Sequence, residues 1–170
     1  MSYHLFNRPG SGGFVVESTL TLAEADFEPT ELDSKAGTPL PESFRETNSL
    51  GQLPILILPD GRTMTVSSAM LMHLAACFPE KNLGPDPGTS EHASFLRLIV
   101  FASVNLYESL FRRGYPFRFT DDEDGYKAIP KAAIRRMGEA LLVIKDNIKG
   151  RFLLGYTMSL ANIHIAMFFI

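Results

Sequence analysis

The sequence lacks the residues that build disulfide frameworks and cysteine-rich metal sites. Its 170 residues include one cysteine, Cys77, and no tryptophan. A single cysteine excludes an internal disulfide and any zinc site with two or more cysteine ligands, and it is typical of a reducing, cytoplasmic compartment. The histidines His4, His92 and His164 show no metal-ligand spacing. We therefore predict no metal site.

An excess of positive charge and a long apolar run are also absent. Lys and Arg number 16 against 19 Asp and Glu, and the formal net charge is -3. This balance gives no bulk attraction to nucleic acid or to an acidic membrane surface. Uninterrupted apolar runs fall short of the roughly 18 residues that a transmembrane helix needs, and the N-terminus shows no secretory signal. We predict a cytoplasmic globular protein with no nucleic acid or membrane partner.

Residues 1–77 show the pattern of alternating strands and helices. In order, they predict a strand over 3–6, a helix over 14–25, a strand over 27–32, a loop over 33–41, a short helix over 42–47, a hairpin of strands 55–58 and 63–66, and a helix over 67–77. Pro29 places the second strand at a sheet edge, because proline has no N–H to donate to a ladder. The order βαβ, hairpin and helix predicts an α/β domain.

Beyond residue 77 the pattern changes to helix only. Residues 78–90 are rich in proline and glycine and are interpreted as a linker. A helix is predicted over 91–111, and Ser159 is the predicted N-cap of a last helix. Between them lies an apolar stripe at helical spacing, formed by Ile134, Met137, Leu141, Ile144 and Ile148. We predict an all-α domain over 91–170.

The segment 48–75 has the features of a small peptide-binding frame. Pro54 supplies no backbone N–H, and a bend there leaves the N–H and C=O of Leu53 free to pair with an extended ligand. A helix start follows at Ser67, where unpaired N–H groups form a site for an anion. A free backbone pair beside an anion site suits a small peptide with a carboxylate.

Three motifs in this chain carry a family resemblance. Residues 48–54 (NSLGQLP) look like N-P-x-G-x-V-P, and residues 65–70 (TVSSAM) look like T-E-S-x-A-I. Residues 152–155 (FLLG) with 159–163 (SLANI) look like F-L-x-G-D-x-x-S-x-A-D-I, with Tyr156 and Asn162 in place of its two aspartates. In this order the motifs resemble the cytosolic glutathione transferase superfamily. The resemblance implies a thioredoxin-like N-terminal domain, an all-α C-terminal domain and a cis Pro54.

The resemblance also implies roles for residues around this frame. Leu53 would pair its backbone with the cysteinyl part of glutathione, and Gln52 would reach the glycyl end. Ser67 would hold the γ-glutamyl carboxylate with its hydroxyl and backbone N–H. Val66 stands where the family commonly has an acidic residue that holds the ligand's amino group. A valine side chain has no group that binds an amine.

Family chemistry is activation of the glutathione thiol, and the loop over 7–13 is the expected place for its hydroxyl donor. Ser11 is the hydroxyl residue in this loop, so the resemblance implies that Ser11 donates to the thiolate, helped by the N–H groups of Gly12 and Gly13. Similar bacterial members often show R-x-G-S-G-S, with a second serine where this chain has Gly13. Tyr3, at the start of the first strand, is a weaker candidate.

Each of these residues also has a purely structural interpretation. Ser11 suits a turn, Ser67 a helix cap, Pro54 a strand edge and Gln52 a solvent-facing position. Cys77 is expected to be a small core residue near a helix end. The aromatic residues Tyr107, Phe111, Tyr115 and Phe117 suit either core packing or the wall of an apolar pocket for a second substrate.

Three functions follow from the resemblance. The first is a homodimeric glutathione transferase that promotes thiolate attack on a small hydrophobic electrophile. The second is a non-catalytic binding or assembly module of the same fold, motivated by Val66, by Gly13 and by a C-terminus shorter than the family usually has. The third is a glutathione-dependent reductase or peroxidase, but the loop over 7–13 has no cysteine, which argues against the disulfide-exchange version of this third function. The last eight residues, 163–170, are apolar, and we expect another part of a longer chain or another subunit to cover them.

Overall fold

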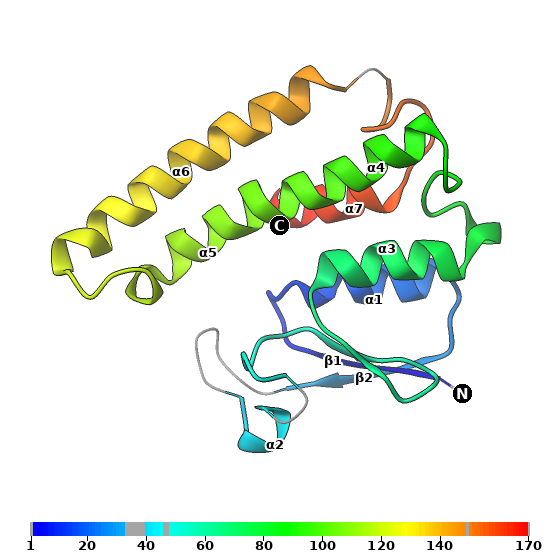
Figure 1. Ribbon diagram of the computed structural model, residues 1–170, viewed down its shortest axis with the longest axis horizontal. Coiled ribbons are helices and arrows are strands. Elements are labelled where there is room, and N and C mark those ends of the chain that lie inside the picture. The colour runs from blue at the N-terminus through cyan, green and yellow to red at the C-terminus, as the bar shows by residue number, and fades with distance from the viewer. Residues whose placement is uncertain (1, 33–39, 46–47, 149, 170) are drawn as a thin grey trace. The chain divides into compact units, whose positions relative to one another are not determined.

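The computed structural model describes residues 2–32, 40–45, 48–148 and 150–169. The chain divides into two compact units, an N-terminal unit over Met1–Gly84 and a C-terminal unit over Pro85–Ile170. The larger part of the predicted loop, 33–39, and the predicted end of the short helix at 46–47 lie outside the described residues. Figure 1 shows the elements of each unit.

The N-terminal unit is built on a four-stranded mixed sheet. Its strands are β1 (Tyr3–Asn7), β2 (Phe27–Glu31), β3 (Ile55–Ile57) and β4 (Thr63–Met64), in the order β2-β1-β3-β4. β1 and β2 are parallel, whereas β1–β3 and β3–β4 are antiparallel. The parallel pair needs a crossover, which α1 provides. β2 is an edge strand, so the placement predicted from Pro29 is confirmed.

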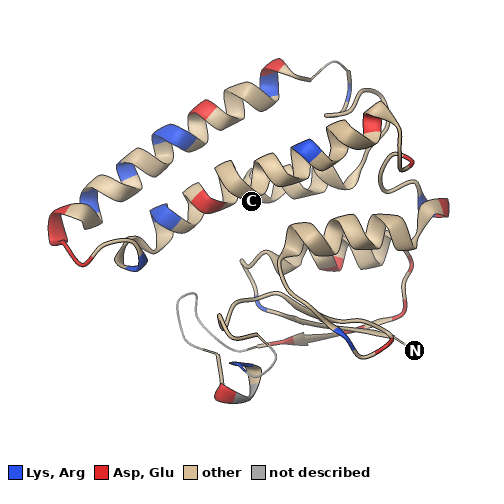
Figure 2. Ribbon diagram, in the orientation of Figure 1, with Lys and Arg blue, Asp and Glu red and all other residues tan. Residues whose placement is uncertain are grey.

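Two helices, α1 (Gly13–Leu22) and α3 (Ser67–Cys77), lie side by side against the sheet (Figure 1). A single turn of helix, α2 (Glu42–Arg45), and the short 3-10 helix η1 (Pro79–Lys81) complete the elements of this unit. Between them α1 and α3 carry one charged residue, Glu17. The ribbons of these two helices are accordingly almost entirely tan in Figure 2. Their apolar residues bury the core with the sheet: Leu5, Val15, Val16, Leu20, Ile55, Leu56, Met70, Leu71 and Leu74.

Two elements end two or more residues earlier than the sequence predicts, and backbone conformation explains both. Glu24 has φ 52° and Val66 has φ 67°, in the left-handed region that ends regular structure for most L-residues. The first helix therefore ends at Leu22 instead of residue 25, and the last strand ends at Met64 instead of residue 66. The peptide bond between Leu53 and Pro54 is cis, as the family resemblance implies.

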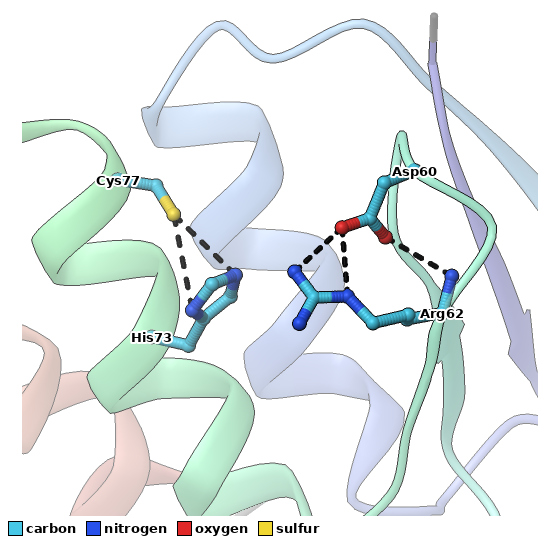
Figure 3. Close-up of polar contacts among 4 residues, drawn as sticks. All are labelled: Asp60, Arg62, His73 and Cys77. Carbon is cyan, nitrogen blue, oxygen red and sulfur yellow. Dashed lines mark hydrogen bonds and ion pairs between the residues drawn. The ribbon is translucent and has the colours of Figure 1, made fainter.

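The predicted hairpin between β3 and β4 is confirmed, and one ion pair holds its turn. The Asp60 carboxylate accepts hydrogen bonds from the Arg62 backbone N–H at 3.0 Å and from Arg62 Nε at 2.7 Å (Figure 3). Arg62 lowers the pKa of Asp60 through these contacts. Gly61 between them has φ 84°, a conformation that glycine adopts without steric cost.

The C-terminal unit contains helices only. The predicted helix over 91–111 is a continuous helical run made of α4 (Ser90–Phe101), the π-helical segment η2 (Ala102–Tyr107) and α5 (Glu108–Gly114). The 3-10 helix η3 (Pro116–Arg118), the long α6 (Glu123–Asp146), α7 (Leu160–Ala166) and the 3-10 helix η4 (Met167–Phe169) follow. α6 packs along α5, and α7 packs along α4.

Helix α6 buries a different set of residues from the predicted apolar stripe. Ile144 is buried, but Ile134 on α6 is 56% exposed, and Ile148, beyond the end of α6, is 44% exposed. The small residues Ala133 and Ala140 are buried instead. The period of the stripe predicts the helix correctly, but the small residues, which allow close approach, face the rest of the unit.

The last helix begins as predicted. Ser159 is the N-cap of α7, and its backbone N–H donates to Asn162 Oδ1 at 3.1 Å. This reciprocal contact is the second half of a capping box, in which the N3 side chain satisfies the N-cap N–H. Asn162 replaces an aspartate of the family motif, and its neutral amide oxygen accepts the same bond.

By length and composition alone, the helical run over Ser90–Gly114 is apolar enough to cross a membrane. This differs from the expectation based on uninterrupted apolar runs, because scattered charges interrupt the run without making the helix polar. Of its most apolar 18-residue window, 33% is buried inside the structure. Core helices of soluble proteins pass the same test.

Candidate functional site

Strand register brings three segments of the N-terminal unit to the same edge of the sheet, the one where β1 and β4 end and β3 begins. Phe6, near the end of β1, pairs with Ile55 at the start of β3. Leu56 pairs with Met64 at the end of β4. The loop after β1, the segment before β3 and the start of α3 after β4 therefore lie at the same edge. These segments contain Ser11, Gln52, Leu53, Pro54, Val66 and Ser67, the leading site residues predicted from the sequence.

The segment before β3 is organised by Asn48. This side chain is buried, donates from Nδ2 to the Gln52 C=O at 2.6 Å and accepts the Leu50 N–H on Oδ1 at 3.2 Å. Within the described residues, the N–H and C=O of Leu53 have no hydrogen-bond partner, and the Gln52 side chain is exposed. Asn48 opens the motif over 48–54, but no role for its side chain was predicted from the sequence.

The start of α3 differs from a simple capped helix. Its N-cap is Val66, with no side-chain cap, so the interpretation of Ser67 as an N-cap is wrong. Ser67 is the first helical residue and is buried, yet its hydroxyl bonds to none of the described residues. The Val66 side chain is 62% exposed. A hydroxyl without a partner and the first N–H groups of an eleven-residue helix together favour an anion.

The loop after β1 places Ser11 in a hydrogen-bonded network. Ser11 Oγ donates to Asn7 Oδ1 at 2.6 Å and accepts the Gly13 N–H at 3.1 Å. The Gly12 N–H finds no acceptor in the described part of the chain. Asn7 was missed from the sequence, because a single asparagine at a strand end carries no motif signal.

Tyr3 and Cys77 lie away from this edge. Tyr3 begins β1, at the opposite end of the strand from Ser11, and burial together with the adjacent Cys77 sulfur raises the pKa of Tyr3. Cys77 Sγ lies 3.4 Å from His73 Nε2 (Figure 3). The prediction of Cys77 as a core residue is wrong: the residue is exposed, because it ends α3 three positions beyond the buried Leu74.

The aromatic residues of the C-terminal unit form a continuous cluster. Ring centroids are 5.9 Å apart for Tyr107 and Phe111, 5.1 Å for Phe111 and Tyr115, and 6.0 Å for Tyr115 and Phe117. The Arg118 guanidinium lies 4.9 Å from the Tyr115 ring centroid. Phe117 is 54% exposed, so the cluster is only partly a core element.

The order of the elements in the two units defines a class of protein. A βαβ unit followed by a hairpin and a helix, with a cis proline before the third strand, is a thioredoxin-like unit, and an all-helical unit follows it. Residues 1–76 match the family described as "Glutathione S-transferase, N-terminal domain". Over 121 residues the chain is 28% identical to an uncharacterized GST-like protein, YncG, of Escherichia coli (strain K12). The match covers 69% of this chain and 57% of YncG, so the chain spans just over half of that relative's length.

Solved structures agree with this assignment. A glutathione transferase from Methylococcus capsulatus str. Bath is 26% identical with a TM-score of 0.82, and BphK, a bacterial GST, is 25% identical with a TM-score of 0.82. A sphingomonad glutathione S-transferase complexed with glutathione is 25% identical with a TM-score of 0.79. Each match covers 98% of this chain and 80% of the other. Residues 1–76 therefore match the N-terminal domain of the glutathione S-transferase family, and the whole chain has the fold of the bacterial glutathione transferases.

Proposed function

We propose that this protein binds glutathione at the edge of its N-terminal sheet and promotes attack of the thiolate on a small hydrophobic electrophile in the cytoplasm. The observation that carries the proposal is the free backbone of Leu53, beside a cis proline and at the same sheet edge as the start of α3. The sphingomonad relative, solved with glutathione, supports the choice of ligand.

The residues at this edge suit the parts of the tripeptide. Leu53 offers one N–H and one C=O to the cysteinyl backbone. Ser67 offers its hydroxyl and the N–H groups of the α3 start to the γ-glutamyl carboxylate, where the helix dipole adds about 0.3–1 kcal/mol. The exposed Gln52 reaches the glycyl end. Val66 leaves the ligand's amino group without a carboxylate partner, so we expect modest affinity.

Thiol activation requires differential stabilisation of the anion. A free thiol has a pKa of about 8.5, and lowering it by two units needs about 2.7 kcal/mol. The donors available on the first loop are the Ser11 hydroxyl and the Gly12 N–H, near the start of α1. Each donor makes a charge-assisted bond to a thiolate that is stronger than its bond to a neutral thiol.

Two measurements test this function together. Calorimetry measures glutathione binding, and a spectrophotometric assay measures conjugation to a generic aryl halide. We expect binding and a glutathione-dependent rate. The absence of both contradicts the proposal. Sedimentation tests the homodimer that we also propose.

A second candidate is a non-catalytic binding or assembly module. Two observations favour it: Val66 in place of an acidic residue, and the Ser11 proton already donated to Asn7. This candidate predicts a stable fold, glutathione-independent partner binding that Ser11→Ala leaves unchanged, and negligible turnover. A large drop in conjugation rate in Ser11→Ala would instead support the enzyme.

A further inference from the structure

Asn7, the last residue of β1, is the centre of the first loop's polar network. Its Oδ1 accepts two hydrogen bonds, from Ser11 Oγ at 2.6 Å and from the Arg8 backbone N–H at 2.7 Å. Its Nδ2 donates to Glu17 Oε2 on α1 at 3.2 Å. One carboxamide therefore connects the end of the strand, the loop and the helix.

These partners fix which way the carboxamide points. The Arg8 N–H is a donor that cannot reverse its role, so the group facing it must be the oxygen. The Glu17 carboxylate on the other side accepts, so the group facing it must be the NH₂. With Oδ1 facing Ser11, the Ser11 hydroxyl must be the donor in the 2.6 Å contact. The direction of this bond thus follows from its neighbours.

The carboxamide also occupies the side-chain space of residue 13. A Cβ added to Gly13 would lie 1.8 Å from Asn7 Oδ1 and 2.2 Å from Asn7 Cγ. Such contacts are far inside van der Waals separation, so any side chain at position 13 would displace Asn7. The polar group at the start of α1 is therefore supplied by Asn7 from the strand end and not by residue 13 itself.

A hydroxyl has one proton, and the Ser11 hydroxyl donates its proton in the hydrogen bond to Asn7 Oδ1. Ser11 Oγ can donate to Asn7 or to a thiolate, but not to both at once. We propose that Asn7 is a positioning residue that holds the Ser11 proton, so that Ser11 reaches the thiolate of bound glutathione only by releasing Asn7. This inference rests on the proposed function. The hydrogen bond from Ser11 to Asn7 makes the bound thiol less acidic than it would be beside a Ser11 hydroxyl that has no bond to Asn7.

The test is the pKa of the bound thiol, measured from the ultraviolet absorbance of the thiolate across a pH titration. In Asn7→Ala we expect this pKa to fall by roughly half to one unit, the equivalent of one released hydrogen bond. In the Ser11→Ala background we expect Asn7→Ala to leave the thiol pKa unchanged, because no hydroxyl remains to be released. A merely structural role would not produce this dependence on Ser11.

Gly13→Ala supplies a second, independent variant in case Asn7→Ala folds poorly. Its added Cβ displaces the carboxamide, so it should lower the thiol pKa in the same direction. It should also lower the thermal midpoint in the native background and have a smaller effect in the Asn7→Ala background, where the space is empty. Asn147→Ala, an exposed asparagine of the C-terminal unit whose Nδ2 donates to the Val143 C=O, is the matched control.

The outcomes distinguish a failure of the proposed role of Asn7 from a failure of the proposed function. If the unmodified chain binds no glutathione, the proposed function fails and the role of Asn7 at the thiol fails with it. If glutathione binds but the thiol pKa is unchanged or higher in Asn7→Ala, this inference alone is overturned. Additive effects of Asn7→Ala and Gly13→Ala on the midpoint would likewise overturn it, because they would show that the two positions do not share one space.

Discussion

His164 gives the sharpest prediction about stability in the C-terminal unit. The side chain is 1% exposed on α7, and neither ring nitrogen has a hydrogen-bond partner among the described residues. Its nearest ring contact is Phe168, with centroids 5.9 Å apart. Burial lowers the pKa of His164 from 6.5 to about 4, because the charged imidazolium loses its hydration. The folded chain therefore holds this histidine neutral.

The sign and size of the pH effect follow from linkage. Because the folded pKa lies below the unfolded value, the unfolded chain binds a proton that the folded chain does not, and stability falls as the pH falls from about 6.5 toward 4. With pKa values of about 6.5 and 4, this one group removes about 2 kcal/mol between pH 7 and pH 5. That is a large part of a typical unfolding free energy of about 5–15 kcal/mol.

The perturbation is His164→Leu, and the assay is urea unfolding at pH 7 and pH 5. We expect the variant to be more stable at pH 7 by about 1–3 kcal/mol, because two unsatisfied buried nitrogens are removed. We also expect its loss of stability between the two pH values to be about 2 kcal/mol smaller than in the native chain. Comparing the two chains cancels the contribution of all other titrating groups.

The matched control is His92→Leu, which makes the same change at a histidine of the same unit that hydrogen-bonds to the Pro85 C=O at 3.0 Å. An identical pH dependence in the native chain and in His164→Leu would refute the reasoning. So would a pH dependence that His92→Leu removes equally well.

Three further predictions concern the site and the last helix. Val66→Glu should tighten glutathione binding by about tenfold, or 1.4 kcal/mol, because a carboxylate would meet the ligand's amino group; calorimetry showing unchanged or weaker binding contradicts it. Ser67→Ala should weaken binding about fivefold, or about 1 kcal/mol, while leaving the urea midpoint unchanged, and a clear loss of stability would point to a structural role. Asn162→Asp should raise stability by about 0.3–1 kcal/mol through the helix dipole while retaining the capping acceptor, and a lower thermal midpoint would argue against it.

Much of the fold follows from local chemistry in the sequence. The order of strands and helices, the edge position of β2 and the N-cap at Ser159 are confirmed, because each depends on a period, a missing N–H or a short-range hydrogen bond. The family resemblance of the motif over 48–54 also predicted a cis peptide bond between Leu53 and Pro54, and the structure confirms it. The roles of Ser11, Gln52, Leu53, Val66 and Ser67 in binding and catalysis stay predictions.

Other features depend on how segments meet. Cys77 belongs to an apolar helix but is exposed, because the helix continues past Leu74, its last buried residue. Ile134 shares a stripe with the buried Ile144 but is exposed, because α6 packs through its alanines. Sequence periodicity gives the existence of a face but not the neighbour it will meet, so burial at the ends and margins of helices follows only from packing.

The sequence by itself determined the order of elements and the resemblance to glutathione transferases, and it predicts a hydroxyl donor in the loop over 7–13. Only the tertiary structure decided the state of that hydroxyl. The Ser11 hydroxyl donates its hydrogen bond to Asn7 Oδ1, and the glycine at position 13 leaves room for the Asn7 carboxamide. The physical reason is that a hydrogen bond depends on distance and direction in space. The turn from strand to helix brings Asn7 into contact with Ser11, four positions along the chain, and with Gly13, six positions along.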